Sequence, residues 1–379
     1  MKIADITAIP VSFPIAEGKG VTLGIGRTVK RDAVLIKVIT DDGVIGWGES
    51  HAGRAPGAVA QLVNTTLRSL VIGMPADAVV DVWQRVYKMQ LASHGLGAGT
   101  AIAMSGLDMA LWDIKGKALG LPLYRLLGGS SKPIAAYAGG ISLGYQPPEQ
   151  LADEARGMVA AGYRALKLRL GDTAANDIAR IAAVRKALGD DIDILTDANA
   201  AYELSDVRRV MPALDDAQAG WLEEPFPPHD WRRYQQAATY GRTPLAAGEN
   251  HYTRFEFVPL LEQSVVSVIQ PDLSKTGGIT EGLRIAAMAG AIKLKINPHT
   301  SLTGLNTASC LHYLCSIDNP GYFEADLSEV NPLRDRLCDW QARISADGTV
   351  LPPDRPGLGV LIDEAMLKEF PLIDGPGYV

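Results

Sequence analysis

The sequence predicts an α/β protein, a modified TIM (β/α) barrel with an α+β capping domain at its N-terminal end. Three observations support this fold class. The first third of the chain has an antiparallel and then a helical pattern, short apolar strands next alternate with amphipathic helices, and acidic residues end consecutive strands. The 379 residues are enough for a barrel of roughly 250 residues and a smaller domain.

The first 48 residues have the pattern of an antiparallel sheet. The run AVLIKVIT at 33–40 is rich in β-branched residues, the Asp-Asp-Gly sequence at 41–43 is typical of a hairpin turn, and VIGWGE at 44–49 resumes the strand. We therefore expect a hairpin near the N-terminus.

A helical pattern follows between about Ala58 and Leu127, where apolar residues recur at helical spacing. Gly120 and Pro122 end its last long helix. We expect residues 1–128 to form the capping domain, together with a C-terminal return over residues 340–379.

The barrel is predicted over residues 129–339. Seven intervals between residues 134 and 324 average about 27 residues, the length that a strand, a helix and two short loops require. The eight candidate strands begin at Ile134, Ala165, Asp193, Gly220, Leu245, Val265, Lys293 and Tyr322.

Composition excludes several classes of protein. Hydrophobic residues make up 47% of the chain and charged residues 21%, and the net charge is −7 without a basic stripe, so we expect no nucleic-acid partner. No apolar run reaches the length of a membrane span, and the N-terminus has no secretory h-region. Three cysteines without a C-x-x-C motif are typical of reduced thiols, which indicates a cytoplasmic protein.

Three acidic residues end three consecutive strands. Asp197, Glu223 and Glu249 are 26 residues apart in each step, one βα unit. Because active sites of such barrels lie at the carboxyl ends of the strands, these carboxylates should converge and repel one another unless a cation neutralises them. Their hard oxygen donors favour Mg²⁺ over zinc.

Two cationic residues lie on the strand before them. Lys167 and Arg169 are two residues apart, so both side chains point to the same face, towards the carboxylates. Buried charges of this kind need partners of opposite charge, which the acidic cluster provides.

The remaining strands end in a histidine and two more acids. Asp272 and His299 are 27 residues apart on consecutive strands, and a carboxylate beside a histidine fixes its tautomer and raises its basicity, as in a general base. Glu324 ends the eighth strand, where it either donates to a substrate carboxylate when protonated or pairs with a cation.

This ring of side chains suits removal of a proton next to a carboxylate. The reaction places a second negative charge on the substrate, and a metal ion with neighbouring cationic side chains stabilises that charge as it forms.

The chain resembles the enolase superfamily, and within it the mandelate racemase group. The motifs GWGE, ALWDIKGKALGLPLYRLLGG, KLRL, DAN, WLEEP, AGEN, QPDLSKTGG and NPH occur in order along nearly the whole sequence. The resemblance implies the metal ligands, the histidine–aspartate dyad and the eighth-strand acid named above, and it places Asn199 against a substrate hydroxyl. It also implies loops over the site at Ala16–Thr28 and Glu49–Pro56, and a homo-oligomer.

The substrate is expected to be a small hydroxy acid or sugar acid. Candidate residues that would bind its far end lie in the loops of the cap: Arg27 and His51 are the first choices, with Lys19, Arg54 and His94 as others.

The second cation departs from the family pattern. The group commonly has lysine as a second base where this chain has Arg169, and a guanidinium stays protonated in proteins. A single base, His299, favours dehydration of a sugar acid to a 2-keto-3-deoxy acid. The alternatives are racemisation or epimerisation with Lys167 as base, cycloisomerisation of a sugar-acid lactone, and a non-catalytic sugar-acid-binding protein.

Overall fold

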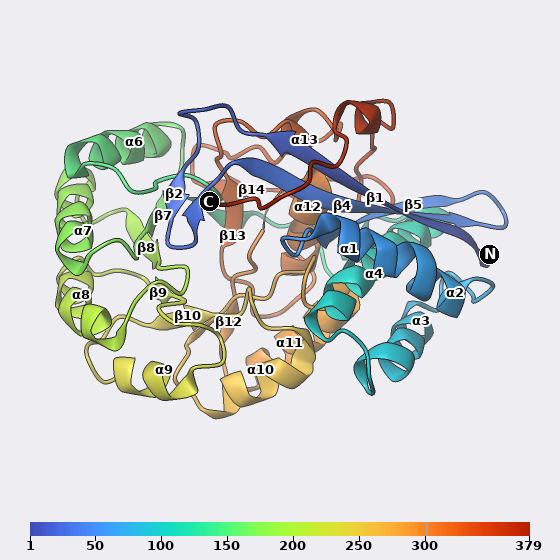
Figure 1. Ribbon diagram of the computed structural model, residues 1–379, viewed down its shortest axis with the longest axis horizontal. Helices are drawn as coiled ribbons and strands as arrows, with labels where there is room; N and C mark the ends of the chain where they lie inside the picture. The colour runs from blue at the N-terminus through green and yellow to red at the C-terminus, as the bar shows by residue number, and fades with distance from the viewer. Residues whose placement is uncertain (301) are drawn as a thin grey trace.

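Eight parallel strands follow one another around a barrel in the computed structural model, which describes residues 1–300 and 302–379 (Figure 1). Their order is β13-β6-β7-β8-β9-β10-β11-β12, and a parallel bridge between Ile296 and Pro320 links the two ends. The strands are β6 (Ile134–Gly139), β7 (Ala165–Arg169), β8 (Asp193–Asp197), β9 (Leu222–Glu223), β10 (Leu245–Ala247), β11 (Val268–Ile269), β12 (Lys295–Ile296) and β13 (Phe323–Asp326). All eight predicted strands are confirmed.

Helices connect these strands and form an arc around them (Figure 1). Local signals begin several of them: the Thr173 side chain accepts a hydrogen bond from the Asn176 N–H, and Glu203 forms a capping box with Asp206. The helices are α6 (Pro148–Ala160), α7 (Ala174–Leu188), α8 (Leu204–Asp216), α9 (Trp231–Ala237), α10 (Thr253–Glu262), α11 (Gly278–Ala291), α12 (Gly304–Leu314) and α13 (Pro332–Asp335). Within the part of the chain described, no helix has the length and apolarity needed to cross a bilayer.

Aromatic side chains fill the floor of the barrel. Tyr137 and Trp221 meet edge to face with ring centroids 5.7 Å apart, and Leu195 and Ala246 pack with them. Since the floor is closed, polar side chains at the carboxyl ends of the strands face only the opposite mouth of the barrel.

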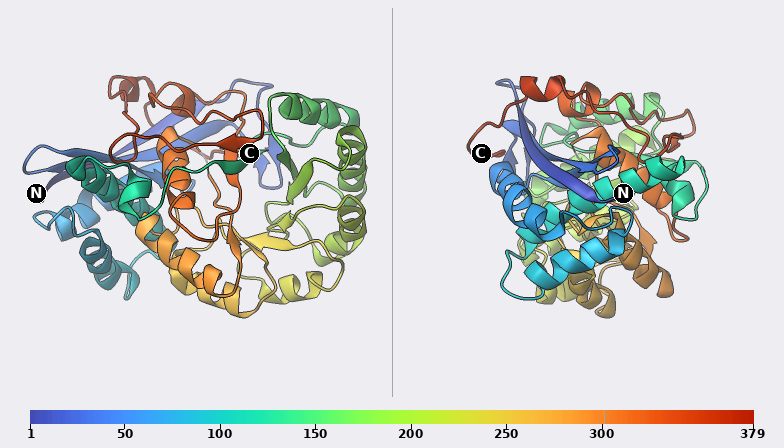
Figure 2. Two further views of the ribbon diagram at one scale, coloured as in Figure 1. Left: turned by 180° about the vertical axis from the view of Figure 1, so that it is seen from behind. Right: turned by 90° about the vertical axis from the view of Figure 1, so that its right-hand side faces the viewer.

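The cap consists of an antiparallel sheet and a group of helices that lie against one side of the barrel, next to α11 and α12 (Figures 1 and 2). The sheet order is β1-β4-β5, with a separate small pair β2–β3. The bounds are β1 (Ile3–Pro14), β2 (Thr22–Leu23), β3 (Gly26–Arg27), β4 (Lys30–Thr40), β5 (Ile45–His51), α1 (Pro56–Gln61), η1 (Leu62–Leu67), α2 (Arg68–Val71), α3 (Val79–Val86), η2 (Tyr87–Leu91), α4 (Ala98–Leu119) and α5 (Leu123–Leu126). The predicted hairpin and the helical stretch after it are confirmed.

The glycines of the GWGE motif let α4 cross the cap sheet closely. A Cβ added to Gly48 would stand 2.1 Å from the Gly106 carbonyl oxygen, and one added to Gly106 would stand 2.6 Å from Ser50 Oγ. Only residues without a side chain fit this crossing.

The same helix fixes the cap to the barrel. Asp108 accepts a hydrogen bond from the Thr280 N–H at 2.9 Å, and Trp112 donates to Thr280 Oγ1 at 2.9 Å. Trp83 of α3 donates to the Gly277 carbonyl at 2.9 Å. The cap therefore meets the barrel just beyond Asp272, at the start of α11.

The C-terminal residues contact both parts of the molecule. The strand β14 (Thr349–Val350) pairs antiparallel with β6, at the barrel, whereas Phe370 O accepts from the Ser12 N–H and Gly377 O accepts from the Val29 N–H of the cap. The end of the chain lies beside β2 in Figure 1.

His312 of α12 joins three segments and should make stability depend on pH. Its Nδ1 accepts from the Tyr124 N–H at 3.1 Å, its Nε2 lies 3.1 Å from the Leu358 carbonyl, and burial lowers its pKa to about 4. The unfolded chain takes up a proton near pH 6.5 and the folded chain only near pH 4, so stability falls as the pH is lowered between these values, by up to about 3 kcal/mol.

We expect His312→Gln to remove this pH-dependent part of the stability while keeping a hydrogen-bond acceptor and a donor. Urea unfolding of both proteins at pH 7.5, 6 and 5 measures it. A stability difference between the two proteins that stays constant with pH would contradict the assignment.

Candidate active site

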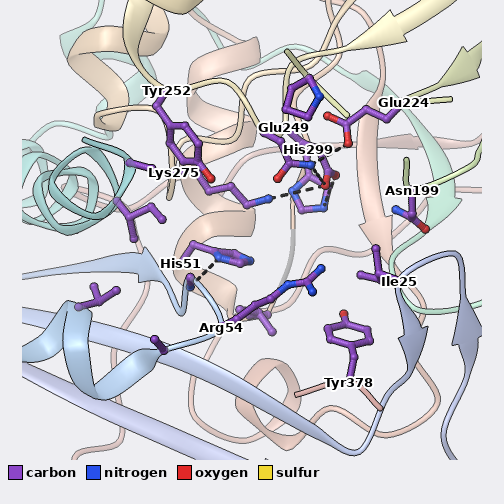
Figure 3. A pocket seen from close by; sticks show the side chains of 18 of the residues that line it. Ile25, His51, Arg54, Asn199, Glu224, Glu249, Tyr252, Lys275, His299 and Tyr378 are labelled. Atoms are coloured by element: carbon purple, nitrogen blue, oxygen red, sulfur yellow. Dashed lines mark hydrogen bonds and ion pairs between the residues drawn. The ribbon is translucent and has the colours of Figure 1, made fainter. Parts of the chain in front are cut away.

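A cavity of about 660 Å³ lies between the mouth of the barrel and the cap (Figure 3). The barrel contributes residues at the ends of consecutive strands, and the cap contributes residues from the two loops predicted to lie over the site. The barrel residues with polar or charged side chains suited to catalysis or binding are Arg169, Asn199, Glu224, Glu249, Lys275 and His299.

The two cations of β7 are buried among the predicted metal ligands. Lys167 Nζ lies 3.1 Å from Glu223 Oε1, 3.0 Å from Glu324 Oε1 and 3.5 Å from Asp197 Oδ2. Arg169 pairs with Asp197 and also donates to the Gly140 carbonyl. Burial alone would lower the pKa values of Lys167 and Arg169, but these carboxylates raise both above their ordinary values, so both side chains are protonated at neutral pH.

Glu223 is the central acid of this cluster. It is fully buried and also accepts hydrogen bonds from Trp221 Nε1 at 3.2 Å and Gln270 Nε2 at 2.7 Å. Burial and the neighbouring Asp197 carboxylate raise its pKa to about 7. The aromatic floor of the barrel thus supports the acid directly through Trp221.

Glu249 pairs with a different set of cationic side chains. Its Oε2 lies 3.1 Å from His299 Nε2 and its Oε1 lies 3.7 Å from Lys275 Nζ. Although burial opposes ionisation, these two cationic partners hold the pKa of Glu249 well below its usual range.

The predicted histidine–aspartate dyad is present. His299 Nδ1 lies 2.7 Å from Asp272 Oδ2, and the other carboxylate oxygen of Asp272 accepts from the Ser274 N–H at 2.8 Å, from Ser274 Oγ at 2.7 Å and from Asn306 Nδ2 at 3.3 Å. Burial would lower the pKa of His299, but Glu249 and Glu324 outweigh it and, with the Asp272 hydrogen bond, raise it to about 9. Asp272 is therefore held rigidly, and it orients the imidazole.

Glu324 is held as a carboxylate. Its Oε1 pairs with Lys167 and accepts from the Gly140 N–H at 3.2 Å. Burial would raise the pKa of Glu324, yet Lys167 and His299 lower it below its ordinary value. Of the two roles considered from the sequence, this geometry favours pairing with a cation.

Two acidic neighbours in the WLEEP motif face different surroundings, and only the first was singled out from the sequence. Glu224 lines the cavity and has a backbone φ of +36°. Asn250 Nδ2 donates to its Oε2 at 2.7 Å, whereas its buried Oε1 has no hydrogen-bond partner among the described residues. Burial and Glu249 raise the pKa of Glu224 well above its ordinary value. From the sequence, only its position directly after Glu223 could have indicated that Glu224 belongs to the site.

Lys275 and Tyr378 also line the cavity and were not predicted. Lys275 belongs to the QPDLSKTGG motif, three residues after Asp272, so its place on the same strand end could have been inferred. Tyr378 lies near the end of the chain, where no local pattern points to a site.

The substrate-binding candidates are divided by the structure. Asn199, His51 and Arg54 line the cavity, whereas Arg27, Lys19 and His94 are not among its lining residues. Arg27 is exposed, and Lys19 pairs with Glu329 at the surface. Ile25 reaches the cavity in place of Arg27 (Figure 3).

Two of the three polar candidates that line the cavity, His51 and Asn199, are uncharged and held by hydrogen bonds. His51 accepts the Gly53 N–H at its Nδ1, and burial together with the nearby Lys275 lowers its pKa to about 3, so it is uncharged at neutral pH. Asn199, at a φ of +45°, donates its N–H and its Nδ2 to the two oxygens of Asp197. Its buried Oδ1 has no hydrogen-bond partner in residues 1–300 and 302–379.

The donor chemistry of the mouth fits a hard divalent cation. Asp197, Glu223, Glu224, Glu249, Asp272 and Glu324 supply six carboxyl groups, and Lys167, Arg169 and Lys275 supply three permanent positive charges. Burial and neighbouring carboxylates raise the pKa values of Glu223 and Glu224, and a divalent cation beside them would stabilise their ionised forms. Among residues 1–300 and 302–379, however, no three acidic, histidine or cysteine side chains converge at metal-binding separation. Instead, ion pairs hold the predicted ligands.

Comparison with known proteins shows that the chain matches two family models. Residues 8–128 match the N-terminal domain of the mandelate racemase and muconate lactonizing enzymes, and residues 150–366 match the enolase C-terminal domain-like model.

Curated relatives carry the names of sugar-acid enzymes. The chain is 32% identical to an arabinonate dehydratase of Saccharolobus solfataricus and 34% identical to a D-galactonate dehydratase of Verminephrobacter eiseniae, each over 89% of this chain and 90% of the relative. It is 32% identical to a D-galactarolactone cycloisomerase of Agrobacterium fabrum, over 92% and 93%.

Solved structures share the whole architecture. An enolase superfamily member of Polaromonas sp. JS666 superimposes with a TM-score of 0.98 at 56% identity, over all of both chains. A racemase of Streptomyces coelicolor A3(2) with bound magnesium superimposes with a TM-score of 0.88 at 28% identity, over 98% of this chain and all of the other.

We expect Mg²⁺ to stabilise the protein through the three strand-end acids. Millimolar MgCl₂ should raise the melting temperature by a few degrees, because a ligand that binds only the folded state stabilises it. Asp197→Asn and Glu223→Gln should lose most of this rise, whereas Glu262→Gln, an exposed position on α10, should keep it. Differential scanning calorimetry measures it, and an equal rise in all four proteins would place the cation elsewhere.

Proposed function

The chain belongs to the mandelate racemase and muconate lactonizing enzyme family of the enolase superfamily, and on that premise we propose that it dehydrates a sugar acid to a 2-keto-3-deoxy acid. The dehydratases of arabinonate and D-galactonate that it resembles along most of its length support the reaction class. A homo-oligomeric state and a cytoplasmic location stay predictions.

Asp197, Glu223 and Glu249 are the residues that would hold Mg²⁺. The ion would supply positive charge beside the substrate carboxylate, where the second negative charge develops. The racemase of known structure with bound magnesium supports this assignment.

His299 is the proposed base. Asp272 holds the ring from the Nδ1 side, so Nε2 is the nitrogen left to take the proton. The pKa of His299 is raised chiefly by Glu249, which contacts that same nitrogen, so the neutral base forms when the Glu249 charge is engaged by another partner.

The observation that carries the proposal concerns β7, where neither Lys167 nor Arg169 can serve as a second base. Lys167 is fully buried under three carboxylates, is not one of the residues that line the cavity, and has a raised pKa. Arg169 lines the cavity but stays protonated. Racemisation needs a proton donor or acceptor on each face of the α-carbon, so this arrangement disfavours it.

One base is enough for elimination. His299 takes the α-proton, the enolate expels the β-hydroxyl group, and the imidazolium returns its proton to that group, which leaves as water. The resulting enol becomes the 2-keto-3-deoxy acid by tautomerisation. Arg169, at the mouth, stabilises the charge on the carboxylate side during these steps.

Cycloisomerisation of a sugar-acid lactone is the second candidate. It uses the same α-proton removal, but the ring oxygen leaves instead of hydroxide. The D-galactarolactone cycloisomerase, at the same identity as the arabinonate dehydratase, favours keeping it. Assays of the open acid and of its lactone separate the two by NMR and mass spectrometry, because dehydration gives a product lighter than its substrate by one water and cycloisomerisation gives an isomer of its substrate.

His299→Asn should abolish dehydration and also stop exchange of the α-proton with D₂O. Loss of a general base typically costs about 10²–10⁴ in rate. Asp272→Asn should be milder, since it misorients the ring without removing it. NMR of deuterium incorporation, with Mg²⁺ and a panel of aldonates and aldarates, measures both. Exchange that persists in His299→Asn and disappears in Lys167→Ala would make Lys167 the base and favour an epimerase.

Arg169→Lys should weaken substrate binding or lower kcat, because an ammonium cannot contact Asp197, Gly140 and a substrate carboxylate with the planar geometry of guanidinium. Arg164→Lys, just before the start of the same strand, is the matched control. Steady-state kinetics at saturating Mg²⁺ compare them. Unchanged kcat and KM in Arg169→Lys would remove Arg169 from the substrate site.

A further inference from the structure

The two sides of the cavity differ in chemistry. The barrel side carries most of the charged groups described above. Besides Arg31, His51 and Arg54, the cap presents aliphatic side chains from the β2–β3 pair (here called the lid), from α1, η1 and α4: Leu23, Ile25, Val59, Leu62 and Ile102. A substrate whose carboxylate meets the barrel mouth directs its far end toward the cap, where these aliphatic side chains form the larger part of the wall.

The segment 377–379 completes this wall. The Arg27 N–H donates to Val379 O at 2.7 Å, the Val379 N–H donates to Arg27 O at 2.9 Å, and the Val29 N–H donates to Gly377 O at 3.0 Å. A Cβ added to Gly26 would stand 2.9 Å from Val379 O, and the φ of Gly26 is +113°. Glycine thus allows the segment to pair closely with the lid.

Tyr378 is the residue that this pairing presents to the cavity. Its ring lies under the Arg54 guanidinium, 5.4 Å from centroid to Cζ, and its hydroxyl points toward the side chains at the barrel mouth (Figure 3). Within the described part of the chain the hydroxyl makes no hydrogen bond to another residue, so it is available to a ligand. The Arg54 guanidinium and the pairing with the lid both restrict the ring.

We propose that Tyr378 is a specificity-determining residue that packs against the far end of the substrate, and that this end is deoxygenated, as in a 6-deoxy aldonate. The inference rests on the proposed function for the identity of the reacting end. The Tyr378 ring and the aliphatic side chains receive the methyl end, while the Tyr378 hydroxyl and the Arg54 guanidinium are available to the hydroxyl groups nearer the barrel mouth.

The physical reason is the cost of an unpaired hydroxyl. A hydroxyl at the far end would lose its water against aliphatic side chains without gaining a partner. Discrimination of one hydroxyl by an apolar pocket reaches about 10²-fold. We expect a preference of tenfold to a hundredfold in kcat/KM for the deoxy acid.

Matched pairs of acids test this preference. D-galactonate and 6-deoxy-D-galactonate differ only in the terminal hydroxyl, as do L-mannonate and 6-deoxy-L-mannonate. With Mg²⁺ present, α-proton exchange in D₂O and 2-keto product report the reaction, and calorimetric titration reports binding without turnover.

The variants are Tyr378→Phe, which keeps the ring, and Tyr378→Ala, which removes it. Tyr378→Ala should raise KM and reduce the preference for the deoxy acid to near parity, while kcat changes by a few-fold at most. Tyr378→Phe should keep most of the preference, because the ring supplies the apolar contact. Asp374→Asn, an exposed position in the same segment, is the control and should behave as the wild type.

The outcomes separate this inference from the proposed function. Exchange with equal or better use of the fully hydroxylated acids, or a preference unchanged in Tyr378→Ala, overturns the inference and leaves the reaction standing. Binding that prefers the deoxy acids without exchange or product overturns the reaction and supports the inference. Absence of both binding and exchange for all four acids overturns both.

Discussion

Buried charge must be compensated, and the rest of the site depends on how the barrel mouth meets this requirement. Lys167 and Arg169 are buried beside Asp197, Glu223 and Glu324, and the ion pairs raise the pKa values of both cations. An unpaired charge at these depths would cost several kcal/mol. The pairs therefore keep both cations protonated, so neither is available as a base, and this is why we propose His299 as the base.

A chain of hydrogen bonds connects the cap to that histidine. Glu49, on the cap strand β5, accepts from the N–H of Asn306, whose Nδ2 donates to Asp272, which in turn orients His299. Burial raises the pKa of Glu49 to about 8, so it is mostly neutral at pH 7 and does not add a charge beside Asp272. The cap thus lines the cavity and also supports the orientation of His299, so its attachment through α4 bears on the geometry of the proposed base.

Much of the fold and part of the site could be predicted from local patterns. Eight strands at one repeat length predicted a barrel, and because parallel strands end at one mouth, Asp197, Glu223, Glu249, Asp272 and His299 were expected to converge. The structure does bring them to one mouth. Lys167 and Arg169 were expected on one face because strand side chains alternate. These inferences depend on periodicities of the chain itself.

Contacts between distant segments were decided only by the tertiary structure. The alternation of side chains along β7 does not predict that Arg169 lines the cavity whereas Lys167 lies beneath the acids. Likewise Ile25 rather than Arg27 reaches the cavity, and Tyr378 enters it from the far end of the chain. The sequence by itself determined which residue types stand at the strand ends. Which of them face one another, and what the cap sets against them, follows from packing between elements hundreds of residues apart, which no local spacing encodes.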